Sequence, residues 1–119
     1  MRSHKLGKDG EAFALEFLAR EGYEIIEANY RCKTGEIDLV AQDHGVVCFI
    51  EVKSRQEDGW DAFEAVDRRK QRKIRQVALY YLLDKFHTED VVARFDVLGV
   101  RLTREGAFEA ELLKDAFGI

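Results

Sequence analysis

The segment GEIDLVAQDHGVVCFIEVKSR, from Gly35 to Arg55, constrains the fold more than any other part of the sequence. Two apolar runs flank the tripeptide DHG, which is typical of two antiparallel strands joined by a tight turn. Four charged residues nevertheless lie inside or beside these runs: Glu36, Asp38, Glu51 and Lys53. An ionised side chain loses solvation when it is buried, so the charges at this end of the hairpin need compensating partners.

The length of the turn decides whether the acids of the two strands meet. A two-residue turn at His44-Gly45 is a favoured hairpin type and places Asp38 opposite Glu51. A four-residue loop keeps this register, whereas a three-residue loop would place Asp38 opposite Ile50. In the favoured register the two carboxylates are neighbours, with Cβ atoms about 5 Å apart.

Adjacent carboxylates repel each other, and burial makes the repulsion worse. A divalent cation would offset it directly, because hard oxygen ligands suit Mg²⁺ or Mn²⁺. Lys53 shares a face with Glu51, since side chains alternate along a strand. The alternative is an ionic cluster in which Lys53 and a basic residue of a helix neutralise the acids without a metal. The residue pattern leaves both interpretations open.

The whole chain, residues 1–119, is expected to form a single domain of the α/β class. The expected elements are, in chain order, a helix over 8–20, strands over 23–31, 36–42 and 46–53, a helix over 62–85, a strand over 91–102, and a last strand or short helix over 107–113, with a strand favoured. This αβββαβ order predicts a mixed sheet with helices packed on it.

Composition excludes several classes of protein. No apolar run approaches the roughly 20 residues of a membrane span, so we expect no membrane partner. The first residues lack the apolar segment of a secretory signal, which favours the cytoplasm. Cys32 and Cys48 form no CxxC pair and are expected to be free thiols. The formal net charge of -4 gives no general basic field, so any nucleic-acid interface must be local.

Each helix directs one charged residue toward the expected sheet. Glu11 falls within the apolar arc of the first helix, so it either points at the sheet or lies in a frayed first turn near the positive end of the helix dipole. Lys70 falls within the apolar stripe of the second helix, between Val66 and Ile74. It either extends past the edge of the core or reaches a phosphate at the acidic end of the hairpin.

The segment RRKQRKIR, residues 68–75, is dense in positive charge. Its candidate phosphate contacts, besides Lys70, are Arg68, Arg69, Arg72 and Lys73. A local basic surface can bind nucleic acid even when the total charge is negative. The alternative is a solvated helix face whose charges pair with nearby acids.

An acid on one strand followed by Glu-x-Lys on the next resembles the motif of the PD-(D/E)XK nucleases. Here it consists of Asp38 and the tripeptide Glu51-Val52-Lys53. The longer pattern of NYRCKTGEIDLVAQDHGVVCFIEVKSR, KQRKIRQVALYYL and RFDVLGV closely resembles the uncharacterised bacterial YraN-like family. Its members are similar to small nucleases of the Holliday-junction-resolvase type. The resemblance extends from Gly7 to about Val100 and implies a restriction-endonuclease-like fold.

The resemblance implies roles for the hairpin residues. Asp38, Glu51 and the backbone carbonyl of Val52 would bind Mg²⁺ or Mn²⁺. Lys53 would orient the attacking water and stabilise negative charge on the phosphate. The two adjacent carboxylates are expected to favour the charged form of Lys53, which favours an electrostatic role over that of a base.

The resemblance also covers residues outside the motif. Glu11 matches the acid that resolvase-like proteins place on their first helix, although Glu36 could compete for this role. Lys70 matches a helix position at which many members have a basic or amide side chain. Asp96 belongs to the family pattern, and we expect for it only a structural ion pair, with Arg94.

Three functions are compatible with these features. The first is a metal-dependent endonuclease that hydrolyses phosphodiester bonds in branched or structured DNA. The second is a nucleic-acid-binding protein on a nuclease-like fold with little or no catalysis, and the third is a partner-binding domain with a purely structural acidic cluster. The combination of acids and basic residues favours the first. Cutting two strands symmetrically would need a homodimer, which resolvase-like relatives form.

Overall fold

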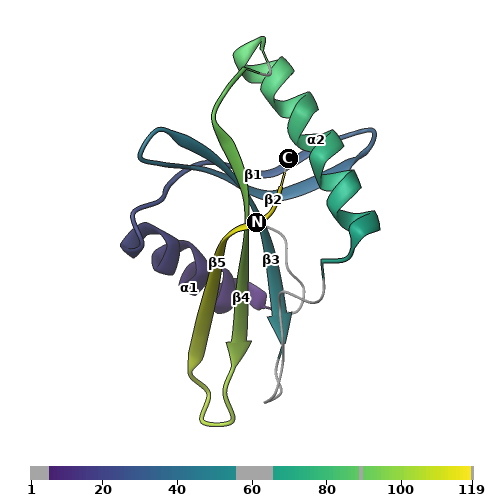
Figure 1. Cartoon of the computed structure of the whole chain (residues 1–119). Helices are drawn as coiled ribbons and strands as arrows, with labels where there is room; N and C mark the ends of the chain where they lie inside the picture. Colours follow the sequence, from purple (N-terminus) through teal and green to yellow (C-terminus); the bar gives the residue numbers. More distant parts are fainter. Residues whose placement is uncertain (1–5, 56–65, 89, 119) are drawn as a thin grey trace.

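The computed structural model describes residues 6–55, 66–88 and 90–118 (Figure 1). Its elements are α1 (Gly7–Arg20), β1 (Glu24–Cys32), β2 (Gly35–Asp43), β3 (Val46–Arg55), α2 (Arg68–Phe86), β4 (Ala93–Leu102) and β5 (Phe108–Phe117). The predicted α/β class is confirmed, and the last segment is a strand rather than a helix. No helix in the described ranges is long and apolar enough to cross a membrane.

The five strands form one sheet in the order β1-β2-β3-β4-β5. The β3–β4 pair is parallel and the other three pairs are antiparallel, so the predicted mixed sheet is confirmed. The physical reason lies in the connections. Antiparallel neighbours can be joined by short turns, whereas a parallel pair needs a long crossover, and the segment between β3 and β4 contains α2.

The β2–β3 turn has the predicted length of two residues, because Asp43 pairs with Val46. His44 and Gly45 both have positive φ, 51° and 85°, which is the signature of a type I′ turn. Glycine adopts such values without strain, and His44 tolerates them in an exposed position. The same register pairs Leu39 with Ile50 further along the strands.

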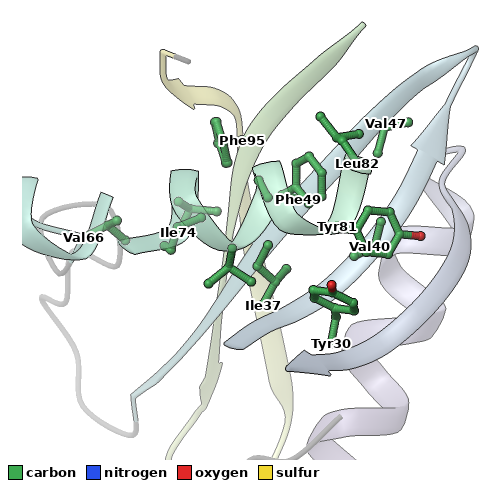
Figure 2. Packing of buried hydrophobic residues seen from close by; sticks show 13 residues of the cluster. Tyr30, Ile37, Val40, Val47, Phe49, Val66, Ile74, Tyr81, Leu82 and Phe95 are labelled. Atoms are coloured by element: carbon green, nitrogen blue, oxygen red, sulfur yellow. The ribbon is translucent and has the colours of Figure 1, made fainter. Parts of the chain in front are cut away.

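The two helices cover opposite faces of the sheet, because side chains of the strands alternate between two cores. Figure 2 shows the core beneath α2, whose buried residues include Val40, Val47, Phe49, Ile74, Val77, Tyr81 and Phe95. The core beneath α1 includes the buried residues Ala14, Leu18, Leu39, Ala41, Cys48, Ile50 and Leu98. Residues 49 and 51 of β3 therefore share the face that α2 covers.

The second helix begins later than the sequence pattern predicted. Asp67 has an extended backbone and its side chain accepts a hydrogen bond from the backbone N–H of Lys70 at 2.9 Å, which makes it the N-cap. Val66 is buried as expected but precedes this cap. The earlier part of the expected helix, residues 62–65, lies outside the described residues.

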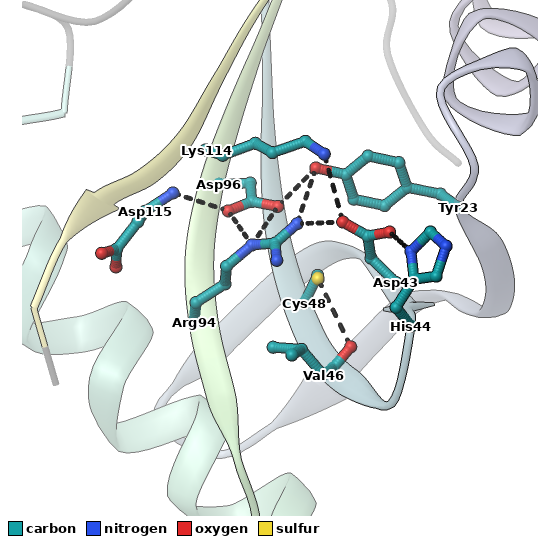
Figure 3. Close-up of polar contacts among 9 residues, drawn as sticks. All are labelled: Tyr23, Asp43, His44, Val46, Cys48, Arg94, Asp96, Lys114 and Asp115. Carbon is teal, nitrogen blue, oxygen red and sulfur yellow. Dashed lines mark hydrogen bonds and ion pairs between the residues drawn. The ribbon is translucent and has the colours of Figure 1, made fainter.

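A buried ionic cluster ties the turn end of the β2–β3 hairpin to β4 and β5 (Figure 3). Arg94 donates hydrogen bonds to Asp96, with Nε–Oδ1 at 3.0 Å, and to Asp43, with Nη2–Oδ2 at 2.7 Å. The hydroxyl of Tyr23 donates to Asp96 at 2.6 Å, and Lys114 donates to Asp43 at 3.1 Å. The expected Arg94–Asp96 ion pair is confirmed, within a larger cluster.

The hydrogen bonds of the cluster stabilise the charged form of Asp43. Hydrogen bonds from Arg94, His44 and Lys114 hold the pKa of Asp43 well below its ordinary value. Burial raises the pKa of Tyr23, and its hydrogen bond to Asp96 raises it further, so the hydroxyl keeps its proton and remains a donor. Both effects favour one fixed arrangement of charge at this end of the hairpin.

We predict that Asp96→Ala lowers the free energy of unfolding by about 3–5 kcal/mol, because it leaves part of a buried ion pair without its partner. Urea unfolding at pH 7 measures the change. Glu111→Ala, on the exposed side of β5, is the control and should change stability by less than about 0.5 kcal/mol. A loss in Asp96→Ala no larger than that of the control would contradict the role of the cluster.

Candidate functional site

The candidate site lies where β2 separates from β3. Backbone pairing of these strands runs from the turn to Leu39 and Ile50, whereas pairing of β1 with β2 continues as far as Cys32 and Gly35. In Figure 1, β1 and β2 continue beneath α2 while β3 runs down beside β4. Asp38 and Glu51 lie one residue beyond the last paired residues, and the charge of Glu51 acts on Asp38, so the two carboxylates are near each other although the backbone pairing does not extend to them.

Where the backbone pairing of β2 with β3 ends, the side chain of Asp38 is the hydrogen-bond acceptor for a backbone N–H of β3. Its Oδ2 accepts a hydrogen bond from the N–H of Val52 at 2.8 Å, which holds the carboxylate against β3. Burial raises the pKa of Asp38 from 3.8 to about 7, and the negative charge of Glu51 raises it as well. The hydrogen bond from Val52 and the charge of Lys70 oppose this shift only in part.

Glu51 is neutralised by two lysines from different elements. The Nζ of Lys70 lies 2.6 Å from its Oε1, and the Nζ of Lys53 lies 3.4 Å from the same oxygen. The side chain of Glu51 is only 11% exposed, so these two cations supply most of the charge compensation that burial requires. The structure therefore brings together Asp38, Glu51, Lys53 and Lys70, four of the predicted site residues.

The two lysines have opposite pKa shifts. Burial lowers the pKa of Lys53, and Lys70 lowers it further, so together they outweigh Glu51. The expectation that the neighbouring acids would dominate is therefore wrong. Burial also acts to lower the pKa of Lys70, but its hydrogen bonds to Glu51 and Lys53 outweigh burial and raise it. Lys70 therefore keeps its proton, and with it the positive charge that pairs with Glu51, more strongly than Lys53 does.

Two further predicted acids lie outside this cluster. Glu11 is half-buried on α1, which covers the face of the sheet opposite to α2. Glu36 forms an ion pair with Arg31, and its negative charge also acts on Asp38, whose pKa it raises. Within the described ranges, no three His, Cys, Asp or Glu side chains are grouped closely enough to hold a metal ion together. The site therefore has two carboxylates, and the auxiliary role of Glu11 stays a prediction.

The predicted phosphate contacts lie in the first half of α2. Four of them are exposed: Arg68, Arg69, Arg72 and Lys73. None of the four forms an ion pair with an acid in the part of the chain that the structure describes. Both interpretations of this surface, a site for phosphates and a solvated helix face, stay predictions, because the acids at 57, 58, 61 and 64 lie outside the described residues.

Arg75 differs from these four residues. Its Nε donates to the carbonyl oxygen of Gly118 at 2.7 Å. Its guanidinium also lies 5.6 Å from the centre of the Phe117 ring. Arg75 therefore connects α2 to the end of β5, and with Arg68, Gln71 and Arg72 it lines an open groove.

Sequence reasoning missed two features. It placed Asp43 beside the turn and gave it no partner, whereas Asp43 is buried with Arg94 and Lys114. It also gave no indication that Lys70, rather than Lys53, is the nearer partner of Glu51. The charged residues inside RFDVLGV were the signal for the first feature. The position of Lys70 in the apolar stripe of α2 was the signal for the second.

We predict that Asp38→Asn removes a pH dependence of stability that the wild type shows in EDTA. The carboxyl ionises near 3.8 in the unfolded chain and near 7 in the folded protein, so the folded state binds more protons between these values. Stability from this group therefore falls as the pH rises through this window. Between pH 4 and pH 8 the free energy of unfolding of the variant should therefore rise by on the order of 3 kcal/mol relative to that of the wild type.

Urea unfolding at several pH values measures this difference. Asp90→Asn, which removes an exposed carboxylate, is the matched control and should follow the wild type. The same pH dependence in Asp38→Asn and wild type would contradict the burial of a destabilised carboxylate at this position.

Comparison with known proteins identifies the family. Residues 10–100 match the model described as "Uncharacterised protein family UPF0102". A UPF0102 protein of Syntrophus aciditrophicus is 45% identical over 114 residues, which cover 95% of this chain and 88% of the relative. A UPF0102 protein of Chlorobium chlorochromatii is 41% identical over 121 residues, which cover 97% of this chain and 92% of the relative. A UPF0102 protein of Caldicellulosiruptor saccharolyticus is 37% identical over 120 residues, which cover 98% of this chain and 100% of the relative. The chain therefore belongs to the UPF0102 family, in agreement with its resemblance to YraN-like proteins.

Proposed function

We propose that this protein is a metal-dependent endonuclease of the PD-(D/E)XK type that hydrolyses phosphodiester bonds in branched or otherwise structured DNA. One observation carries the proposal. Two carboxylates and two lysines meet where β2 separates from β3, beside a row of exposed basic residues on α2. Such a site suits the simultaneous binding of a cation and a phosphate.

The donor set suits Mg²⁺ or Mn²⁺. The N–H of Val52 occupies one oxygen of Asp38, and the lysines occupy Oε1 of Glu51. Residues within the described ranges leave the second oxygen of each carboxylate without a hydrogen bond. Mg²⁺ is usually held by one or two carboxylates together with water and substrate phosphates, so two acids suffice. The backbone carbonyl of Val52 is the proposed further ligand.

A divalent cation held there would polarise a phosphate oxygen and make a water molecule more acidic. Lys53 lies beside Glu51 and would compensate the negative charge that develops on the phosphate. Its lowered pKa also suits a role in accepting a proton from the attacking water. The protein's own contribution is thus to position the phosphate and to place positive charge beside it.

The basic residues of α2 extend the site along the helix. Arg68, Arg69 and Lys70 occupy the first turn, where the helix dipole already contributes positive charge. Like charge at this end is unfavourable until an anion binds. Because the net charge of the chain is -4, the attraction to DNA is confined to this surface. We infer that the backbone of the substrate lies along the first half of α2.

A nucleic-acid-binding protein with little or no catalysis is the second candidate. The observation that favours it is the neutralisation of Glu51 by Lys53 and Lys70, which makes an ionic cluster that is satisfied without a metal. In that case the basic residues of α2 would bind nucleic acid and the acids would have a structural role only.

Two further proposals follow from a resolvase-like activity. Symmetric cutting of two strands needs two active sites, and one chain supplies one, so we propose that the active form is a homodimer. A DNA substrate also favours action in the bacterial cytoplasm.

Cleavage of a labelled substrate panel tests the function. The panel contains single-stranded DNA, duplex, nicked duplex, flap and four-way junction, each incubated with Mg²⁺, Mn²⁺ or EDTA. We expect metal-dependent cutting, strongest on the flap or junction. A Glu51→Gln, Lys53→Ala double variant should cut at least about 100-fold more slowly, because it loses both a proposed metal ligand and the charge beside the phosphate.

Glu111→Ala, purified in the same way, is the control for contaminating nucleases and should cut like the wild type. Cutting that survives in the double variant would contradict the assignment of the site. Absence of cutting in every condition, with DNA binding retained by both proteins, would favour the binding function instead.

We predict that an Arg68→Gln, Arg69→Gln, Arg72→Gln variant binds DNA less tightly and with weaker salt dependence. Three lost phosphate contacts should reduce the slope of log K against log salt by about 2–3. Fluorescence anisotropy between 50 and 200 mM salt, about the range over which such slopes are measured, gives both quantities. The matched control is Lys8→Gln, Lys33→Gln, Arg104→Gln, which removes three exposed charges elsewhere. Equal slopes in the two triple variants would contradict a DNA-binding role for α2.

A further inference from the structure

Lys70 is carried by a different kind of secondary-structure element from the other members of the candidate site. Asp38, Glu51 and Lys53 belong to the sheet, whereas Lys70 comes from the first turn of α2. Its side chain is 38% exposed, yet its Nζ lies nearer to Glu51 than that of Lys53 does, at 2.6 Å against 3.4 Å. Lys70 thus extends from the surface of the helix to a carboxylate that is almost buried.

This lysine can move without disturbing the fold. The N-cap of α2 uses the backbone N–H of Lys70 and leaves its side chain free of that role. The side chain has a flexible four-carbon stem, and its exposed neighbours include the basic residues Arg69 and Lys73 besides the N-cap Asp67. A phosphate bound on this surface therefore lies within the range that the ammonium group can explore.

The ammonium group of Lys70 and a divalent cation would compete for the same carboxylate. Two positive charges a few ångströms apart repel each other strongly in a site that is mostly shielded from water. A phosphate has the opposite effect, because it attracts Lys70 as well as the cation. Lys53 remains beside Glu51 in either arrangement.

We propose that Lys70 holds Glu51 until DNA binds and then transfers to a substrate phosphate, so that DNA binding and metal binding strengthen each other. This inference rests on the proposed nuclease function and adds a coupling between substrate and cofactor to it. In the absence of DNA, Lys70 stands in for part of the charge of the metal and keeps the metal affinity low. Because coupling is reciprocal, the metal must raise the affinity for DNA by the same factor.

Calorimetric titration of Mn²⁺ without DNA tests the first half of the proposal. Lys70→Met should bind Mn²⁺ about tenfold more tightly than wild type, because the competing charge-assisted hydrogen bond is lost. Lys85→Met removes a lysine from the other end of α2 and should bind Mn²⁺ like the wild type. Lys70→Arg keeps the charge and should also remain close to the wild type.

Fluorescence anisotropy of a labelled four-way junction, with and without Mn²⁺, tests the second half. Both proteins carry Lys53→Ala in this assay, which slows cutting, and gels after each titration confirm that the DNA is intact. Mn²⁺ should tighten DNA binding by a larger factor in the protein that retains Lys70 than in the one with Lys70→Met. For each protein, the ratio of the DNA affinity with Mn²⁺ to the DNA affinity without Mn²⁺ measures the coupling. A general loss of DNA binding in the variant cancels in this ratio. Circular dichroism and urea unfolding confirm that the variants are folded.

The outcomes separate this inference from the function on which it rests. If neither wild type nor Lys70→Met binds Mn²⁺, with or without DNA, the proposed metal site is wrong and the inference falls with it. If both bind Mn²⁺ and the affinity of Lys70→Met is equal or weaker, the metal site stands and the role of Lys70 is overturned. Equal coupling factors in the two proteins also overturn it.

Discussion

The two-residue turn at His44-Gly45 is the constraint on which the rest of the structure depends. It sets the register of β2 against β3, and a shift of one residue would exchange the faces of every side chain on one strand. The present register directs Phe49 and Glu51 toward α2 and Ile50 toward α1. One turn therefore decides both which residues form the two cores and which carboxylates meet at the far end of the hairpin.

The hairpin carries an ionic cluster at each end, and the two clusters differ in how well their acids are satisfied. At the turn, Asp43 and Asp96 accept hydrogen bonds from Arg94 in fixed geometry, and the pKa of Asp43 is lowered. At the other end, Asp38 has a raised pKa beside a second acid. A site that stabilises its charges internally is suited to holding a fold together. A site that leaves a carboxylate poorly compensated is suited to binding a cation from solution.

The sequence predicted much of this arrangement because the relevant information is local. Alternation in the strands, the His44-Gly45 turn and the apolar stripe of α2 each depend on neighbours within a few residues, and all three are present. The errors concern quantities that depend on distant contacts. The burial of Asp43 requires Arg94 and Lys114 from two other strands, and the lowered pKa of Lys53 depends on Lys70 from a helix. Nothing in the local pattern of β3 could show that burial and a second lysine would together outweigh the effect of Glu51 on the pKa of Lys53.

A site of this kind faces a conflict between stability and binding. The carboxylates must be close together to hold a cation, yet their repulsion weakens the protein whenever the cation is absent. A fixed counter-charge such as Arg94 would remove the repulsion and also the affinity for the metal. Lys70 offers an intermediate solution, because it neutralises Glu51 from a separate element with a side chain that is partly exposed. In the proposed mechanism the folded protein would then be stable without the metal, and a phosphate bound on α2 would determine when the carboxylate becomes available.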